Sequence, residues 1–128
     1  MTTPTSRVVF SPASQAALSR GIHQIAAAVR PTLGPLPRLV MVENAIRTRS
    51  PELLDDAGIL ARRIISLPDR DADMGAMLLR NALWRLRSKV GDGAATATVL
   101  FEAAYREGRK YVASGGNPMP LRTALERG

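Results

Sequence analysis

The stretch Gly91-Asp92-Gly93-Ala94-Ala95-Thr96-Ala97-Thr98-Val99-Leu100 separates two segments whose apolar residues have helical spacing. Its glycines predict a tight turn, where the backbone comes close to a ligand because no side chain intervenes. The helix that follows begins with N–H groups that lack intrahelical partners, and such an end suits an anion. The same residues also suit a plain connector, in which Asp92 caps the helix and the glycines only turn the chain.

Asp92 decides which anion would fit this turn. A carboxylate repels a bare phosphate, but it suits a phosphate that carries Mg²⁺, because Mg²⁺ takes one or two carboxylates together with phosphate oxygens. Thr96 and Thr98 add hydroxyl groups near the start of the helix. The turn therefore predicts a magnesium–phosphate site, with a structural connector as the alternative.

Apolar residues along the rest of the chain predict a mainly α fold. One example is the series Leu18, Ile22, Ile25 and Val29, which recurs on a single helical face. Patterns of this kind predict helices near residues 12–30, 57–67, 74–90, 94–114 and 118–127. The expected N-caps are Ser11, Asp56 and Asn117.

The segments between these helices predict loops and one hairpin. Residues 38–42 and 51–54 have strand-type side chains, and the polar residues 43–50 would join them. Residues 8–10 are a further short strand candidate, and the acidic segment 69–73 is expected to be a loop. The predicted architecture is a helical bundle with one small β hairpin.

Composition and charge fit one globular domain. The chain has 128 residues, of which 45% are hydrophobic and 23% charged, as in ordinary soluble proteins. Its net charge of +7 invites a nucleic-acid interpretation. The excess is spread over both halves and forms no basic tail, which favours solvated helix faces instead.

Several classes of chemistry are excluded by residue content. The absence of cysteine excludes disulfides, thiol catalysis and Cys-bound zinc, and a single histidine, His23, cannot build a His cluster. No apolar run approaches the length of a membrane span, and the N-terminal residues are polar. We therefore expect no membrane contact and a cytoplasmic location.

The decapeptide 91–100 resembles the GDGTTTATVL signature of the group I chaperonins, the GroEL family. Four further blocks resemble motifs of that family and follow in the same order. They are Thr32-Leu33-Gly34-Pro35 (TLGP), Ala61-Arg62-Arg63-Ile64 (AREI), Asp73-Met74-Gly75-Ala76 (ENMGAQ) and Gly115-Gly116-Asn117-Pro118-Met119 (G-x-NPM). Several motifs in register are far more specific than any one of them.

The resemblance implies that residues 1–128 form the N-terminal half of an equatorial domain, which binds ATP and builds the chaperonin ring. The implied cofactors are ATP and Mg²⁺, and the implied partners are other chaperonin subunits in a homo-oligomeric ring. Because the family chain is several times longer, this interpretation makes the chain a fragment or a shortened descendant. Unfolded clients would then bind only through domains that are absent here.

The family's site residues carry over to matching positions. Asp92 would bind Mg²⁺, and Asp56 matches the catalytic acidic residue near the γ-phosphate and the attacking water. Asp55 stands where the family has a lysine beside the phosphates. The other nucleotide-binding residues that the resemblance implies are Thr32, Leu33, Gly34, Pro35, Gly93, Ala94, Ala95 and Thr96.

Departures from the family pattern weaken the implied site. Ala94 and Ala95 replace two threonines, and Asp55 inverts a charge at close range. The family's second equatorial half, with a further carboxylate, has no counterpart among these residues. We therefore expect weak Mg-ATP binding and negligible ATP hydrolysis by this chain alone.

Two other functions stay open from the sequence. One is a binding module without ATPase activity, which would dock on chaperonin rings through residues 8–10 and 38–54. The other is a small basic helical protein that binds nucleic acid through its arginines and Trp84. Trp84 shares a helix face with Arg80 and Arg87, where it could stack on a base or face a partner; more often such a side chain packs on a neighbouring element.

Overall fold

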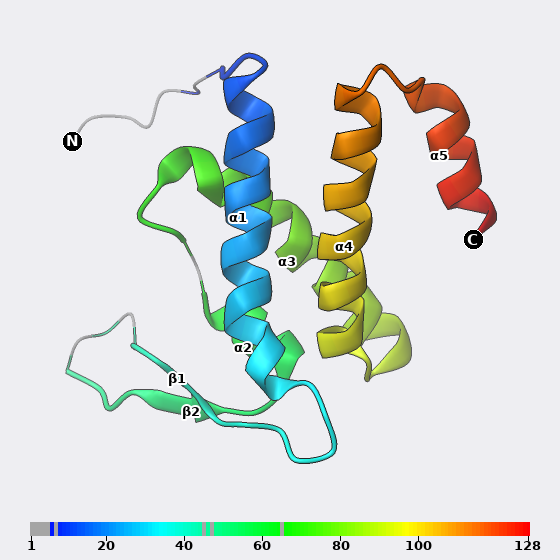
Figure 1. Ribbon diagram of the computed structural model, residues 1–128. Coiled ribbons are helices and arrows are strands. Elements are labelled where there is room, and N and C mark those ends of the chain that lie inside the picture. The colour runs from blue at the N-terminus through cyan, green and yellow to red at the C-terminus, as the bar shows by residue number, and fades with distance from the viewer. Residues whose placement is uncertain (1–5, 7, 45, 47, 65) are drawn as a thin grey trace.

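A computed structural model describes residues 6, 8–44, 46, 48–64 and 66–128, and Figure 1 shows how the elements are arranged. Most of this part of the chain is helical, and one two-stranded sheet lies at the lower end of the helices. The mainly α fold with a small hairpin is therefore confirmed. In chain order the elements are α1 (Ala13–Val29), the 3-10 turn η1 (Arg30–Thr32), β1 (Val40–Val42), β2 (Glu52–Leu54), α2 (Ala57–Arg63), α3 (Arg70–Val90), α4 (Ala94–Ala113) and α5 (Pro118–Arg127).

The core lies where α1 crosses α3, which is the most extensive contact between elements. Each helix has a glycine at the crossing. A Cβ atom on Gly21 would lie 1.7 Å from the carbonyl oxygen of Ala72, and one on Gly75 would lie 2.2 Å from that of Leu18. The two backbones therefore touch directly. Larger side chains fill the core on one side of the crossing, among them Ile22, Ile25, Val29, Leu60, Leu79 and Leu83.

The hairpin covers one edge of this core. β1 and β2 pair antiparallel, with Val40 opposite Leu54. These two side chains pack against the core, whereas the next pair, Met41 and Leu53, is exposed. The alternation along both strands gives the hairpin one buried face and one exposed face.

Two predicted helix boundaries are wrong. α2 ends at Arg63 rather than residue 67. Leu67 precedes a proline, which disfavours helical backbone at that residue, and the Leu67 N–H donates to Asp73 Oδ1 at 3.1 Å instead of continuing the helix. α3 begins at Arg70, inside the acidic segment that we expected to be a loop. Asp69 caps it by accepting from the N–H groups of residues 71 and 72, since carboxylates stabilise the start of a helix.

The N-terminal segment also differs from expectation. Pro12, not Ser11, occupies the N-cap position of α1, and no side chain caps that helix. The strand predicted at residues 8–10 is not formed, and no other strand lies beside this segment among the described residues. Val8 and Phe10 are exposed. The caps expected from Asp56 and Asn117 are confirmed.

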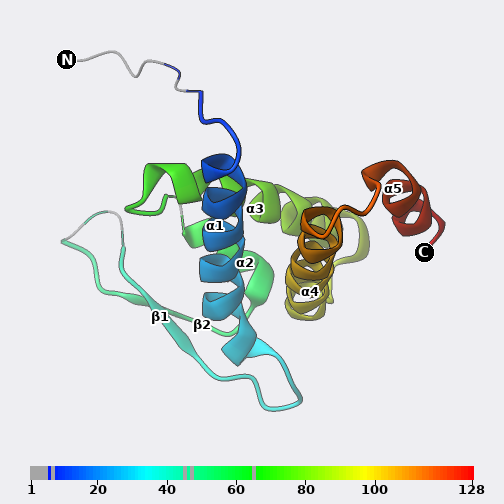
Figure 2. The ribbon, with the colours of Figure 1, turned by 45° about the horizontal axis from the view of Figure 1, so that its top comes forward.

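α4 is attached to α1 by a buried carboxylate. Glu102 accepts from Arg30 Nη2 at 2.6 Å, and its other oxygen lies 2.6 Å from His23 Nδ1. α5 then runs beside α4 at the edge of the molecule and has no buried residue (Figure 2). Within the described ranges, none of the helices has the length and apolar character that crossing a membrane requires.

Candidate functional site

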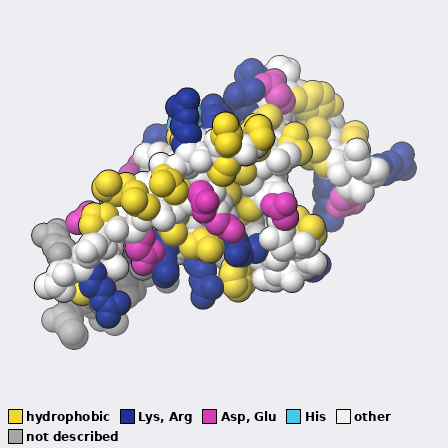
Figure 3. Space-filling model, turned by 90° about the horizontal axis from the view of Figure 1, so that it is seen from below, with side chains coloured by type: hydrophobic (Ala, Val, Ile, Leu, Met, Phe, Trp, Pro, Cys, Tyr) yellow, Lys and Arg dark blue, Asp and Glu magenta, His cyan; other side chains and the backbone are white. Residues whose placement is uncertain are grey.

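Three segments that are far apart in the sequence line one cavity of about 450 Å³. They are the loop after α1, the junction between β2 and α2, and the turn between α3 and α4. All three lie at the lower end of the molecule in Figure 1, and Figure 3 shows acidic side chains around a hollow on that face. The lining consists of Thr32, Leu33, Gly34, Pro37, Asp55, Asp56, Ala57, Arg87, Gly91, Asp92, Gly93, Ala94, Ala95 and Thr96.

The turn between α3 and α4 is built by two glycines in the left-handed region. Gly91 ends α3 with φ +85°, and Gly93 begins α4 with φ +83°. These angles favour glycine because a Cβ atom would be strained there. Asp92 lies between the two glycines, and its Oδ1 accepts from the N–H of Gly93 at 2.6 Å. The carboxylate is exposed, and its second oxygen has no recorded partner in the described part of the chain.

The N-terminus of α4 faces the cavity without a side-chain cap. Gly93 is the N-cap residue and supplies no side chain. By contrast, α2, α3 and α5 are capped by Asp56, Asp69 and Asn117. The first N–H groups of α4 are therefore available to an anion in the cavity.

Asp56 caps α2 and also pairs with Arg87, and only the first of these roles was predicted from the sequence. Its Oδ1 accepts from the N–H of Ile59 at 2.9 Å, which caps α2, and also from Arg87 Nη1. Partial burial would raise the pKa of Asp56, but the hydrogen bonds from Arg87 and Ile59 and the charge of Arg87 together lower this pKa below its ordinary value of 3.8. Asp56 is thus ionised at neutral pH and already paired.

The cavity gathers the sequence-predicted site residues with one exception, because Pro35 is not part of its lining. Two threonine hydroxyls are also unavailable to a ligand. Thr32 donates to the carbonyl oxygen of Val29 at 2.7 Å, and the buried Thr98 donates to that of Ala94 at 2.7 Å. Thr96 is the threonine of this turn that is both exposed and part of the lining.

Arg87 is the main residue of the cavity that sequence reasoning missed. The sequence predicted only that it shares a face of α3 with Trp84. Arg87 lies one helical turn before Gly91, at the end of the helix that leads into the glycine turn. That position could have indicated from the sequence that Arg87 lies near the proposed site.

The charges of the lining favour a cation-bearing anion over a bare one. Asp55, Asp56 and Asp92 supply three carboxylates, against the single guanidinium of Arg87. The described residues contain no cluster of three or more side chains that could hold a metal ion by themselves. Mg²⁺ that is already bound to phosphate needs only one or two protein carboxylates, and this donor set fits that requirement.

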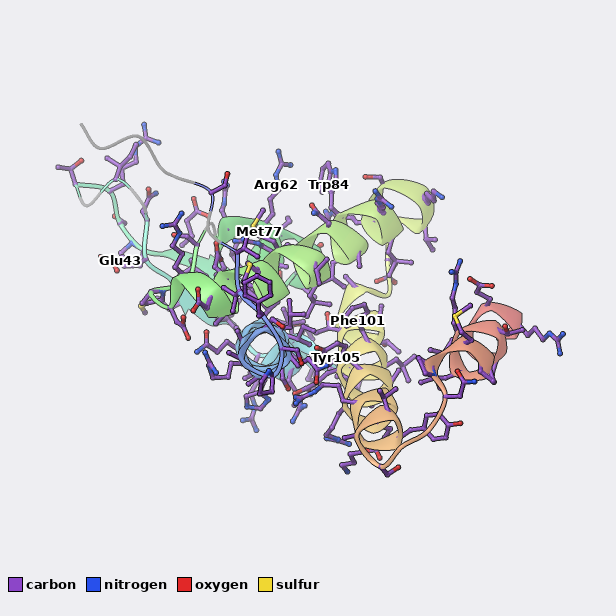
Figure 4. All side chains as sticks on the ribbon, turned by 90° about the horizontal axis from the view of Figure 1, so that it is seen from above. Glu43, Arg62, Met77, Trp84, Phe101 and Tyr105 are labelled. Atoms are coloured by element: carbon purple, nitrogen blue, oxygen red, sulfur yellow. The ribbon has the colours of Figure 1, made fainter. Side chains whose placement is uncertain are left out.

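Trp84 lies outside this cavity and packs on a neighbouring helix, as predicted. The guanidinium carbon of Arg62 lies 4.5 Å from the centroid of the indole ring, and Figure 4 shows the two side chains side by side on the outer face of the helices. This cation–π pair gives Trp84 a structural partner within the chain.

Comparisons of sequence point to the chaperonins. The chain is 39% identical over 120 residues to "Chaperonin GroEL 1" of Polaromonas naphthalenivorans (strain CJ2), a match that covers 94% of this chain and 22% of the relative. It is also 39% identical over 118 residues to "Chaperonin GroEL 1" of Synechococcus sp. (strain CC9605), covering 92% of this chain and 21% of the relative. The chain thus spans about a fifth of the length of these curated relatives. No family model matches it.

Comparisons of structure agree. The chaperonin gp146 from the bacteriophage EL 2 (Pseudomonas aeruginosa), crystallised in the presence of ATP-BeFx, matches with a TM-score of 0.63 and 21% identity over 78% of this chain and 17% of its own. A second crystal form of gp146 matches with the same TM-score and 25% identity, over 73% of this chain and 16% of its own. The resemblance to the GroEL-type chaperonins is therefore confirmed in sequence and in fold.

Proposed function

We propose that this chaperonin-like chain binds a magnesium–nucleotide through its phosphates and acts as a segment of an ATP-dependent protein-folding machine. Asp92 would hold the Mg²⁺, which neutralises phosphate charge when bound. The N–H groups of residues 94–96, which follow the N-cap Gly93, would receive the phosphates, and the loop 32–35 would border the nucleotide through its backbone. Residues 1–128 would be part of an equatorial domain in a cytoplasmic ring.

One observation carries the proposal, namely the convergence of three distant motifs around an uncapped helix N-terminus. If residues 91–93 only connected α3 to α4, there would be no reason for the loop after α1 and the Asp55–Asp56 junction to lie around the same cavity. The negative lining supports a ligand that brings its own cation. The relatives support the class of protein, since both are named chaperonins.

Binding without hydrolysis is the form of this function that the site favours for the chain by itself. Hydrolysis needs a water held in line with the phosphorus and charge compensation around the phosphates. Asp56, the residue proposed to act near that water, is engaged by both Ile59 and Arg87. This pairing also favours the alternative of a ring-docking module without ATPase activity, with the exposed face of the β1–β2 hairpin as its proposed contact.

Calorimetric titration of the 128-residue chain tests the proposal. We expect saturable binding of ATP with Mg²⁺ and at least tenfold weaker binding when EDTA removes the metal. Phosphate release under the same conditions should stay at background. Absence of binding at millimolar Mg-ATP would refute the nucleotide site, and turnover that Asp56→Ala abolishes would refute binding without hydrolysis.

A further inference from the structure

We infer that Arg87 is a phosphate-binding residue of the cavity and that Gly58 fixes its position. The inference rests on the proposed nucleotide site. It adds to that site a positively charged side chain, which the family motifs do not supply here because Asp55 stands where the family has a lysine. It names a residue on α3, outside the motifs at 32–35, 55–56 and 91–100 that first indicated the site.

Positive side-chain charge is scarce in the described lining of the cavity. Among the described lining residues Arg87 is the sole lysine or arginine, and three carboxylates share this lining. A triphosphate would add further negative charge to this space. Mg²⁺ compensates part of that charge, and a guanidinium at the wall of the cavity would compensate more.

The geometry of Arg87 leaves donors free for a ligand. Its recorded hydrogen bond within the described residues runs from Nη1 to Asp56 Oδ1. A guanidinium has five N–H donors in a rigid fork, so Nε and Nη2 remain for phosphate oxygens while Nη1 stays with Asp56. Because Asp56 holds one end of the fork, the group is oriented before a ligand arrives.

Gly58 makes this placement possible. It is buried in the first turn of α2, and a Cβ atom there would lie 2.8 Å from Arg87 Cδ and 3.1 Å from Arg87 Nη1. Glycine is a poor helix former, and α2 has only seven residues. Close packing against Arg87 explains why a glycine is found at this position. The Arg87 side chain lies across the space that a larger residue would fill.

A purely structural role for Arg87 makes a different prediction. If Arg87 only stabilised the α2 cap through Asp56, its removal would lower the unfolding temperature and leave ligand affinity unchanged. A phosphate-binding role predicts a loss of Mg-ATP affinity in protein that is still folded. Calorimetry and thermal unfolding of the same samples separate the two.

The experiment compares four variants with the unaltered chain. Arg87→Gln should weaken Mg-ATP binding by about tenfold or more, because hydrogen bonds to charged groups are the strong ones. Arg87→Lys should recover only part of that loss, since it restores the charge without the fork. Arg122→Gln removes the same charge from an exposed pair on α5 and should change nothing.

Gly58→Ala is the variant that leaves net charge unchanged and favours helix formation. The methyl group should displace Arg87, so we expect several-fold weaker Mg-ATP binding from a chain that still folds. Binding by Arg87→Gln and Gly58→Ala within twofold of the unaltered chain would overturn the inference and leave the proposed site standing. No Mg-ATP binding by the unaltered chain would overturn the proposed site and this inference with it.

Discussion

The crossing of α1 with α3 and the turn from α3 into α4 both depend on glycine, for opposite reasons. At the crossing, Gly21 and Gly75 are required because there is no room, and an added Cβ atom would meet backbone. At the turn, Gly91 and Gly93 have positive φ angles, and an added Cβ atom would meet nothing within 4 Å. The first pair supplies close packing and the second supplies a backbone conformation.

This difference separates where the chain is stable from where it can bind. The crossing is buried and its backbones are in direct contact, so it leaves no space for a ligand. The turn is exposed, and it presents unbonded N–H groups and the Asp92 carboxylate to a cavity. Substitutions at the crossing should therefore change stability, whereas those around the turn should change affinity.

The largest effect is expected at the crossing. Gly21→Ala should lower the free energy of unfolding by about 3 kcal/mol or more, because the methyl group has to separate α1 from the backbone of α3. Chemical denaturation followed by circular dichroism measures this. The matched control is Gly108→Ala in α4, where an added Cβ atom would lie 3.6 Å from Leu121 Cδ2, an ordinary contact. That variant should gain up to about 1 kcal/mol from helix propensity. Equal unfolding midpoints for the two variants would disprove the packing role.

The turn should show the reverse pattern. Asp92→Ala should weaken Mg-ATP binding by about tenfold and remove its dependence on Mg²⁺, because one carboxylate ligand of the metal is lost. Its free energy of unfolding should change by less than about 1 kcal/mol, since the side chain is exposed. Glu126→Ala on α5 carries the same change of charge and should leave calorimetric titrations unaltered. Mg²⁺-dependent binding that survives in Asp92→Ala would place the metal elsewhere.

Asp56 contributes to both stability and the cavity, because it caps α2 and also lines the cavity. Asp56→Asn keeps a capping oxygen and removes the charge that faces Arg87. With 38% of its side chain exposed, the ion pair is partly screened, so the loss at pH 7 should be below about 1 kcal/mol. Because the native pKa is lowered, this stabilisation is present above pH 3.8 and disappears as the pH falls through the native pKa.

Urea denaturation at a series of pH values measures that dependence. The difference in unfolding free energy between the unaltered chain and Asp56→Asn should shrink below pH 3.8. The variant is its own control, since asparagine does not titrate. A difference that stays constant from pH 7 to about pH 2.5 would show that the charge of Asp56 contributes nothing to stability.

Much of the fold could be predicted from the sequence because its signals are local. The spacing of apolar residues and the Asp56 and Asn117 caps predicted the helices, and strand-type residues on both sides of a polar loop predicted the hairpin. The errors occur where contacts outside the apolar pattern decide the structure. The Leu67 N–H bonds to Asp73 instead of extending α2, and Asp69 starts α3 within the acidic segment. The requirement for glycine at position 21 likewise depends on the crossing of α1 with α3.

The candidate site was predictable to a similar extent. The motifs around Thr32, Asp56 and Asp92 could be recognised in the sequence, and the fold places them around one cavity. The pair between Arg87 and Asp56 could not be predicted, because the two residues are 31 positions apart and meet only through the packing of α2 on α3. The sequence therefore suggested a cavity with inverted charge at Asp55, and the structure adds the Arg87 guanidinium to the lining of the same cavity.

The smallest effect is expected at Asp55, and it tests how much of the missing positive charge Arg87 replaces. Asp55→Lys should tighten Mg-ATP binding by about two- to fivefold, because it changes repulsion of the phosphates into attraction at the rim of the cavity. The gain is modest because Asp55 is exposed and solvent screens its charge. Asp55→Asn, which only removes the negative charge, should give about half of the gain in free energy. Raising the salt concentration should reduce both gains, as screening requires. If Asp55→Lys binds no tighter than the unaltered chain at low salt, then Asp55 does not face the phosphates, and the negative charge of the cavity comes from Asp56 and Asp92 alone.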